Sequence, residues 1–229
     1  MSSPLAYVAD PGNPWFSAQY LRDNSGTVLN ALREHAELTG QSVLIAAAVA
    51  IPLAVAAYWF RRLTGPILAV TGVLYTVPSL ALFAFVAPYL GTGTRTVVLG
   101  LVLYALLLII RNTLAGLTQV PAEVRDAAEG MGYGRFGRLL RIDLPLALPG
   151  ILTGLRLATV STVALTTVGV LVGHGGLGQL ILGGFRNNFY KAEILTGTVL
   201  CVLLALVLDL AIAGVGRLLT PWAARRVAA

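Results

Sequence analysis

Residues Gly173 to Gly178 read GHGGLG and satisfy the G-x-G-x-x-G spacing with which glycines approach the phosphates of a dinucleotide. That chemistry requires a strand directly before the glycines and a helix after them. Here the glycines instead follow an apolar stretch of lipid-spanning length, so we reject nucleotide binding at this segment. A phosphate loop of the G-x-x-x-x-G-K-[ST] type is excluded, because Lys191 is the only lysine and follows Tyr190.

Other enzyme chemistry has no better support in the sequence. It offers no Ser-His-Asp or Cys-His arrangement in a plausible aqueous site. Cys201 is the only cysteine and lies in an apolar stretch, which excludes an intrachain disulfide and a cysteine metal cluster. The only two histidines, His35 and His174, do not support a metal site. We therefore expect no catalytic residue, no bound cofactor and no metal in this chain.

Two charged residues, Arg156 and Asp209, interrupt otherwise apolar stretches. Charges inside a membrane are costly unless they pair or reach water. Arg156 follows Pro145 by about eleven residues, and Asp209 precedes the end of its stretch by about ten, so both belong at a similar depth on the cytoplasmic side. This spacing predicts that they pair. The alternative is that each side chain extends separately to the interface.

The stretches that position these residues are long and apolar. Of the 229 residues, 57% are hydrophobic and only 11% are charged, which is too little charge to coat a soluble globule. A helix needs about 20 predominantly apolar residues to cross a bilayer. The expected fold is therefore all-α, a polytopic bundle of about five transmembrane helices. We expect these helices near 40–60, 66–88, 95–111, 146–172 and 193–219.

The segments that flank the bundle are less informative. The start of the chain lacks a basic region followed by a short apolar run and a small-residue cleavage site, so we expect no removable signal peptide. Residues 15–38 carry apolar positions at mixed helical spacing and predict a short helix along the outer interface or an ordered cap. The expected division is an outer segment over 1–38, a transmembrane domain over 39–219 and a cytoplasmic tail over 220–229.

Basic residues predict the orientation of the bundle, because short cytoplasmic loops carry an excess of lysine and arginine. Five spans divide the loops into two alternating sets. The richer set, predicted to lie inside, holds Arg61, Arg62, Arg111, Arg125, Arg135, Arg138, Arg141, Arg217, Arg225 and Arg226. The poorer set holds Arg22, Arg33, Arg95, Arg186 and Lys191. The N-terminus is therefore expected outside and the C-terminus in the cytoplasm. The net charge of +6 is then a topology signal, and nucleic-acid binding is not expected.

Pro78 is expected inside the second span, with Tyr75, Thr76 and Ser79 nearby. A proline there leaves a backbone carbonyl without its helical donor, and polar neighbours can satisfy it. The resulting kink predicts that these four residues line a translocation pathway, or that the helix simply bends. The outer glycines Gly173, Gly175, Gly176 and Gly178 predict a flexible gate or a docking surface for a binding protein, with a tight interhelical turn as the alternative.

Residues 112–145 form the only long hydrophilic stretch predicted on the inner side. Pro121 suits the first turn of a helix, and AEVRDAAE follows with good helix formers. Three glycines around Gly132 predict a break before a second helix, RFGRLLRI, which Pro145 is expected to end. A solvated connector whose basic face meets anionic lipid is the alternative to a functional loop.

This stretch resembles the signature loop of ABC importer permeases. The family pattern is an acidic residue, two alanines, three residues, a glycine, nine residues and Ile-x-Leu-Pro, and the chain departs from it only in carrying aspartate where glutamate is usual. The resemblance implies that the 122–145 loop docks on a cytoplasmic ATPase, with charged contacts at its rim. The residues that it assigns to this contact are Asp126, Ala127, Ala128, Gly132, Ile142, Leu144 and Pro145, with Arg135, Arg138 and Arg141.

Three further segments resemble the osmoprotectant branch of that family, which takes up glycine betaine, choline, carnitine or proline. They are TVPSLALFAF from Thr76, YALLLIIRNT from Tyr104 and VGHGGLGQLI from Val172, although Leu108 stands where those relatives usually have proline. The alternatives are a permease for methionine or another amino acid and, in a different class, a membrane channel or structural protein without an ATPase.

The resemblance also implies the fold, the membrane and the partner proteins of the chain. It predicts a type I ABC importer permease fold in a bacterial cytoplasmic membrane, and transport in place of enzyme activity. The expected partners are ABC ATPase subunits, a second permease subunit that is a copy or a paralogue, an extracytoplasmic substrate-binding protein and membrane lipid. ATP and Mg²⁺ are expected on the ATPase.

Overall fold

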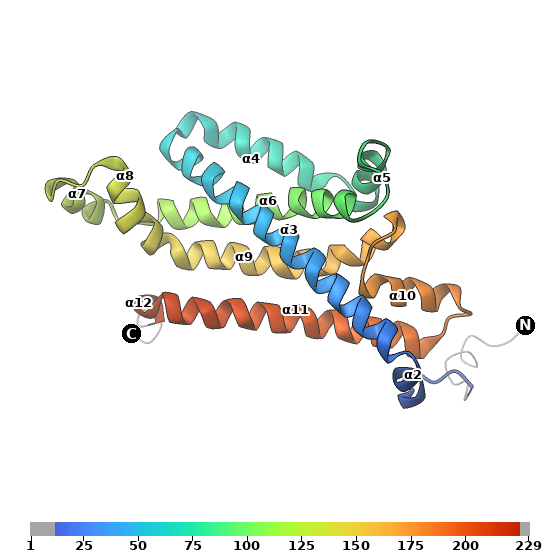
Figure 1. Ribbon diagram of the computed structural model, residues 1–229. Coiled ribbons are helices and arrows are strands. Elements are labelled where there is room, and N and C mark those ends of the chain that lie inside the picture. The colour runs from blue at the N-terminus through green and yellow to red at the C-terminus, as the bar shows by residue number, and fades with distance from the viewer. Residues whose placement is uncertain (1–11, 225–229) are drawn as a thin grey trace, which may run out of the picture. The chain divides into compact units, whose positions relative to one another are not determined.

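The computed structural model describes residues 12–224, and among these it contains helices, turns and loops but no strand (Figure 1). Four runs are long and apolar enough to cross a membrane: α3 (Ser25–Trp59), α6 (Thr94–Thr118), the run Arg135–Val172 and α11 (Lys191–Leu219). A bent pair, α4 (Arg61–Thr76) and α5 (Ser79–Leu90), adds a fifth if it forms one broken span. The expected all-α bundle of about five spans is confirmed. Half of the predicted tail, residues 225–229 with Arg225 and Arg226, lies outside the described residues.

The first span begins earlier than expected. A short helix, α2 (Ala18–Asp23), is capped by Ser17, whose hydroxyl accepts a hydrogen bond from the Tyr20 amide at 3.1 Å. Helix α3 then starts at Ser25 instead of near residue 40. Most of the segment expected to lie along the interface therefore belongs to the first long helix.

The second span is two helices, where a single helix over 66–88 was expected. Helix α4 ends at Thr76 and α5 begins at Ser79, so the interruption falls on Val77 and Pro78. The backbone of Val77 is extended, which is the conformation favoured directly before a proline. Proline also lacks the amide hydrogen that would continue the helix.

The polar stretch forms α7 (Ala122–Gly130), α8 (Arg135–Arg138) and a π-helical turn, η1 (Leu139–Asp143). Helix α6 continues to Thr118, so Arg111 lies within a helix and not in the loop. The expected helix end at Pro145 is wrong, because α9 (Leu144–Thr166) follows η1 without a break. A proline in the first turn of a helix removes no hydrogen bond that the turn requires, and the wide π turn precedes it.

The remaining elements follow the expected order. A 3₁₀ segment, η2 (Thr167–Val172), extends α9, and the glycine-rich segment leads to α10 (Leu177–Arg186). Helix α11 comes next, close to the expected range 193–219, and a single turn, α12 (Pro221–Ala224), ends the described chain.

The described residues divide into two compact units, and each long helix contributes to both. Unit 1 contains the chain up to Gly40 with Ser79–Gly100 and Val163–Leu206. Unit 2 contains Gln41–Pro78, Leu101–Thr162 and the chain from Val207 onward.

Within unit 1, α10 packs against the first turns of α3 and α11. Its buried residues Leu177 and Leu180 form a core with Ala31, and Leu200 and Leu204 pack against that core. This burial fixes α10 and the glycine-rich segment that precedes it. Tyr20 of α2 also lies in this unit, and burial, with the neighbouring Glu193 and Tyr190, raises the pKa of its hydroxyl to about 12.

Within unit 2, α6 and α9 approach closely through glycines. A Cβ atom built on Gly150 would lie 2.9 Å from the Gly116 Cα, and one built on Gly154 would lie 2.8 Å from the Asn112 Cβ. Gly150 and Gly154 have the small-xxx-small spacing with which membrane helices pack backbone against backbone. This close contact holds α9, and with it the inner loop, against α6.

We expect Gly154→Ala to lower the free energy of unfolding by about 1–3 kcal/mol, the usual cost of overpacking a tight contact. The added methyl group would also meet the Ile109 Cα and the Leu108 carbonyl oxygen, both at 3.2 Å. Denaturant unfolding in micelles, followed by circular dichroism, measures the change. Gly214→Ala is the matched control, because a Cβ on this α11 residue meets nothing within 4 Å. Equal stability of the two variants would contradict the close contact.

Candidate functional site

The loop over residues 122–145 presents one face of α7 to the surroundings. Asp126 and Ala127 are exposed, whereas Ala128 is fully buried and packs inside the chain. Two large apolar side chains, Val124 and Met131, are also exposed on this polar segment.

Gly132 forms the sharp turn after α7. Its φ of +83° lies in the left-handed region, which only glycine adopts at little cost. The amides of Met131, Gly132 and Tyr133 donate to carbonyl oxygens in the last turn of α7 at 2.9–3.1 Å. The three hydrogen bonds close the end of the helix, so the Gly132 backbone sets the direction in which the chain leaves α7.

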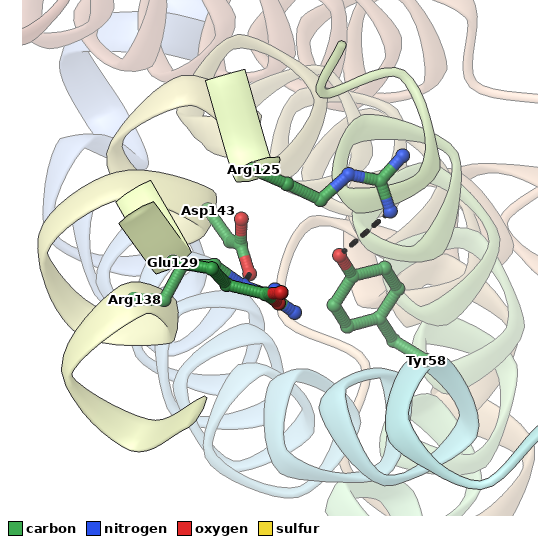
Figure 2. Close-up of polar contacts among 5 residues, drawn as sticks. All are labelled: Tyr58, Arg125, Glu129, Arg138 and Asp143. Carbon is green, nitrogen blue, oxygen red and sulfur yellow. Dashed lines mark hydrogen bonds and ion pairs between the residues drawn. The ribbon is translucent and has the colours of Figure 1, made fainter. Parts of the chain in front are cut away.

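Arg138 points into the loop rather than toward its rim. Its guanidinium contacts the Glu129 carboxylate, and its Nε lies 3.4 Å from Asp143 Oδ2 (Figure 2). Asp143 is fully buried in the π turn, and the Arg138 side chain is only 14% exposed. The prediction placed Arg138 among the rim contacts, whereas here it ties α7 to the start of α9.

The other two predicted rim arginines differ from each other. Arg135 donates a hydrogen bond to the Trp59 carbonyl oxygen at 3.0 Å and lies over the Trp59 ring at 5.4 Å from its centroid. Arg141 is exposed. A further arginine that the prediction did not include, Arg125, donates to the Tyr58 hydroxyl at 3.3 Å (Figure 2). The sequence gave no sign of this contact, because Tyr58 lies 67 residues before Arg125.

The outer glycine-rich segment is a tightly packed turn, which was the second of its two predicted forms. Gly173 and Gly176 have φ angles of +98° and +49°. A Cβ atom on Gly176 would lie 2.5 Å from the His35 Cβ, and one on Gly178 would overlap the Thr167 carbonyl oxygen. A left-handed φ therefore explains Gly173, and close approach explains Gly176 and Gly178, while a role as gate or docking surface stays a prediction.

Two adjacent polar residues of α3 hold this segment, and sequence reasoning missed both. His35 is fully buried, lies 3.0 Å from the Val163 carbonyl oxygen through Nε2, and accepts the Leu177 amide at Nδ1. The Glu34 carboxylate lies 3.0 Å from His174 Nδ1 and accepts a hydrogen bond from the Gln179 side-chain amide at 3.0 Å. The polarity of this pair was the available signal, but the neighbouring Arg33 and Glu37 are polar too, so the sequence did not single the pair out.

The helix break at Pro78 has a partner outside the predicted group. The Tyr104 hydroxyl donates to the Val77 carbonyl oxygen, and the Tyr104 ring packs edge-on against Tyr75 at 5.7 Å. Thr76 instead donates to the Val73 carbonyl oxygen of its own helix at 2.7 Å. The Val77 carbonyl oxygen at the break is therefore satisfied from α6, whereas the Leu74 carbonyl oxygen, which loses the Pro78 donor, accepts from the Val77 amide at 3.4 Å.

Arg156 and Asp209, which were predicted to approach each other, form a two-pronged ion pair within unit 2. Arg156 Nε lies 2.8 Å from one carboxylate oxygen of Asp209, and Nη2 lies 2.7 Å from the other. This parallel geometry is the strong form of an arginine–carboxylate contact. Their side chains are 43% and 22% exposed on the chain, so the pair lies at its surface.

The long apolar helices define the chain as a multi-pass membrane protein. Residues 42–225 match the family described as "Binding-protein-dependent transport system inner membrane component". The chain belongs to this family, whose members are transport proteins that work with binding proteins and ATPases.

Curated relatives cover almost the whole chain. The glycine betaine/carnitine/choline transport system permease protein OpuCD of Bacillus subtilis (strain 168) is 39% identical over 88% of this chain and 88% of its own. The choline transport system permease protein OpuBD of the same organism is 37% identical over 92% and 93%. The osmoprotectant import permease protein OsmW of Salmonella typhimurium is 33% identical over 88% and 96%.

Solved structures establish the same fold. A chain of the inward-facing MetNI methionine ABC transporter superimposes with a TM-score of 0.79, covering 86% of this chain and 98% of its own. The two sequences are only 21% identical, so this likeness concerns the fold. The expected type I ABC importer permease fold is confirmed.

Proposed function

We propose that the chain is the membrane-spanning permease subunit of an ATP-driven importer for osmoprotectants such as glycine betaine, choline, carnitine or proline, in a bacterial cytoplasmic membrane. The observation that carries the proposal is the 39% identity to a permease named for glycine betaine, carnitine and choline over 88% of both chains. A methionine importer has the weaker case, because its structural likeness comes with 21% identity.

The ATPase partner binds the exposed face of α7 in this proposal. Asp126 supplies a polar contact, and the small Ala127 lets the partner backbone approach closely. The exposed Val124, Met131 and Phe136 supply apolar surface around them. Interfaces of this kind combine an apolar centre with a polar rim. Ile142, Leu144 and Pro145 then transmit the movement into α9, while ATP and Mg²⁺ remain on the ATPase.

The distribution of basic residues supports an inner position for unit 2. The eight described arginines of the richer set all belong to unit 2, and the five basic residues of the poorer set all belong to unit 1. The positive-inside rule then favours the outer side for the loops that carry the poorer set, where a binding protein would deliver substrate to the segment around Gly173. Tyr75, Thr76, Pro78 and Ser79 are candidates for the pathway, which a second permease subunit would complete.

Uptake by the assembled transporter tests the proposal. We expect labelled glycine betaine uptake by the permease, co-expressed with its ATPase and binding protein in a strain without its own osmoprotectant importers, to require ATP. Unlabelled choline, carnitine or proline should compete, whereas methionine should not. Uptake that only methionine reduces would reject the substrate class, and conduction by the isolated chain without an ATPase would reject the importer.

A further inference from the structure

A pocket in unit 2 gathers arginine side chains from three elements. It lies beside the end of α3 and is lined by Tyr58, Trp59, Arg61, Arg125, Arg135 and Arg138 among other residues. Arg61 begins α4, Arg125 comes from α7, and Arg135 and Arg138 come from α8. Four cationic groups around one pocket create a strongly positive potential that favours an anion.

Only one of these four arginines is neutralised within the described chain. Arg138 pairs with Glu129 and Asp143, whereas no described carboxylate pairs with Arg61, Arg125 or Arg135. Three donors on the lining residues, Trp59 Nε1, Arg125 Nε and Arg138 Nε, also have no hydrogen-bond acceptor among the described residues, although these three atoms are themselves buried. Arg125 Nη1 donates to the Tyr58 hydroxyl (Figure 2). The pocket is therefore rich in donors and positive charge, which matches the oxygens of a phosphate group.

An apolar groove adjoins this pocket and shares two of its residues. Trp59, Phe60, Arg61, Arg62 and Leu63 line the groove, and Trp59 and Arg61 also line the basic pocket. Phe60 is 55% exposed and Leu63 is 43% exposed, directly beside the two exposed arginines. Tryptophan and arginine at the end of an apolar span are typical of the headgroup level of a bilayer.

We propose that the basic pocket binds the phosphate group of an anionic phospholipid, whose acyl chains lie along the groove at Phe60 and Leu63. A free phosphate ion would use the pocket alone, and it gives no account of the adjoining apolar groove. A lipid uses both parts. The bound headgroup would join α4 to α7 and α8, so the lipid contributes to the position of the loop.

Fluorescence of Trp59 tests this proposal in the full chain. Trp15→Phe and Trp222→Phe leave Trp59 as the only tryptophan, and the chain is reconstituted with brominated phosphatidylglycerol or brominated phosphatidylcholine of the same acyl chains. We expect phosphatidylglycerol to quench Trp59 at a lower mole fraction. Arg61→Gln and Arg125→Gln should each reduce this preference about fivefold, the contribution of one basic residue near a membrane surface.

Arg217→Gln is the matched control, because it removes an exposed arginine of unit 2 that does not line the pocket, and it should keep the preference. Arg61→Lys and Arg125→Lys should retain most of it, which distinguishes charge loss from misfolding. Equal quenching by both lipids would overturn the proposal. Loss of the preference in excess inorganic phosphate would identify a free-phosphate site, and its loss on assembly with the ATPase would assign the pocket to that protein; either result overturns lipid binding.

Discussion

Replacing Gly132 with valine is expected to abolish ATP-driven uptake while the chain still inserts in the membrane. A residue with a side chain is strained at a φ of +83°, by about 1–2 kcal/mol for an ordinary residue and more for a β-branched one. A Cβ atom at this position meets nothing within 4 Å, so the whole effect comes from the backbone. The chain would leave α7 in another direction, and the exposed face at Asp126 would no longer be aligned with α9.

Gly134→Val is the matched control for this change. Gly134 lies two residues further on and also has nothing within 4 Å of a built Cβ, but its φ of −67° is open to any residue. We expect this variant to retain most of its uptake. The measurements are substrate uptake and ATP hydrolysis by the assembled complex, with membrane abundance of each variant as the reference. If both valine variants transport equally, the Gly132 turn does not couple the two proteins.

The spans were predictable because lipid imposes a length and a composition on them. Helix α11 was expected over 193–219 and runs from Lys191 to Leu219, because a charged residue marks each end of its apolar run. Helix α3 was harder to predict. The apolar positions of residues 15–38 recur at mixed helical spacing, which suggested an interfacial segment. In the fold, however, Glu34 and His35 bind the glycine-rich segment, so their polarity serves tertiary contacts.

Local patterns also predicted the turn at Gly132 but not the directions of the arginines around it. Arg135, Arg138 and Arg141 recur at three-residue spacing, which suggested one exposed basic face. The π turn changes that spacing, and the buried Asp143 attracts Arg138 inward. The partners of Arg125 and Arg135, Tyr58 and Trp59, come from the end of α3. Contacts between segments so distant in the sequence depend on the packed fold, and a single sequence does not contain them.

Loss of one member of the Arg156–Asp209 pair is expected to reduce the amount of folded permease in the membrane strongly. Asp209→Asn removes the negative charge and one of the two acceptor oxygens, and leaves Arg156 with its full charge among apolar helices. An unpaired intramembrane charge must be hydrated or carried to the interface, and both distort the packing of α9 and α11. Membrane abundance and uptake per permease molecule measure the effect.

The exchanged pair separates mutual attraction from a separate role of each charge. In Arg156→Asp/Asp209→Arg the charges remain opposite, so we expect folded permease to recover well above the level of either single variant. The neutral pair Arg156→Gln/Asp209→Asn should recover partially, because no unpaired charge remains. Non-additivity of this kind is the signature of two residues in direct contact. Two results would mean that the ion pair contributes nothing to assembly. One is normal abundance and uptake in the single variants, and the other is an exchanged pair that is no more abundant than the less abundant single variant.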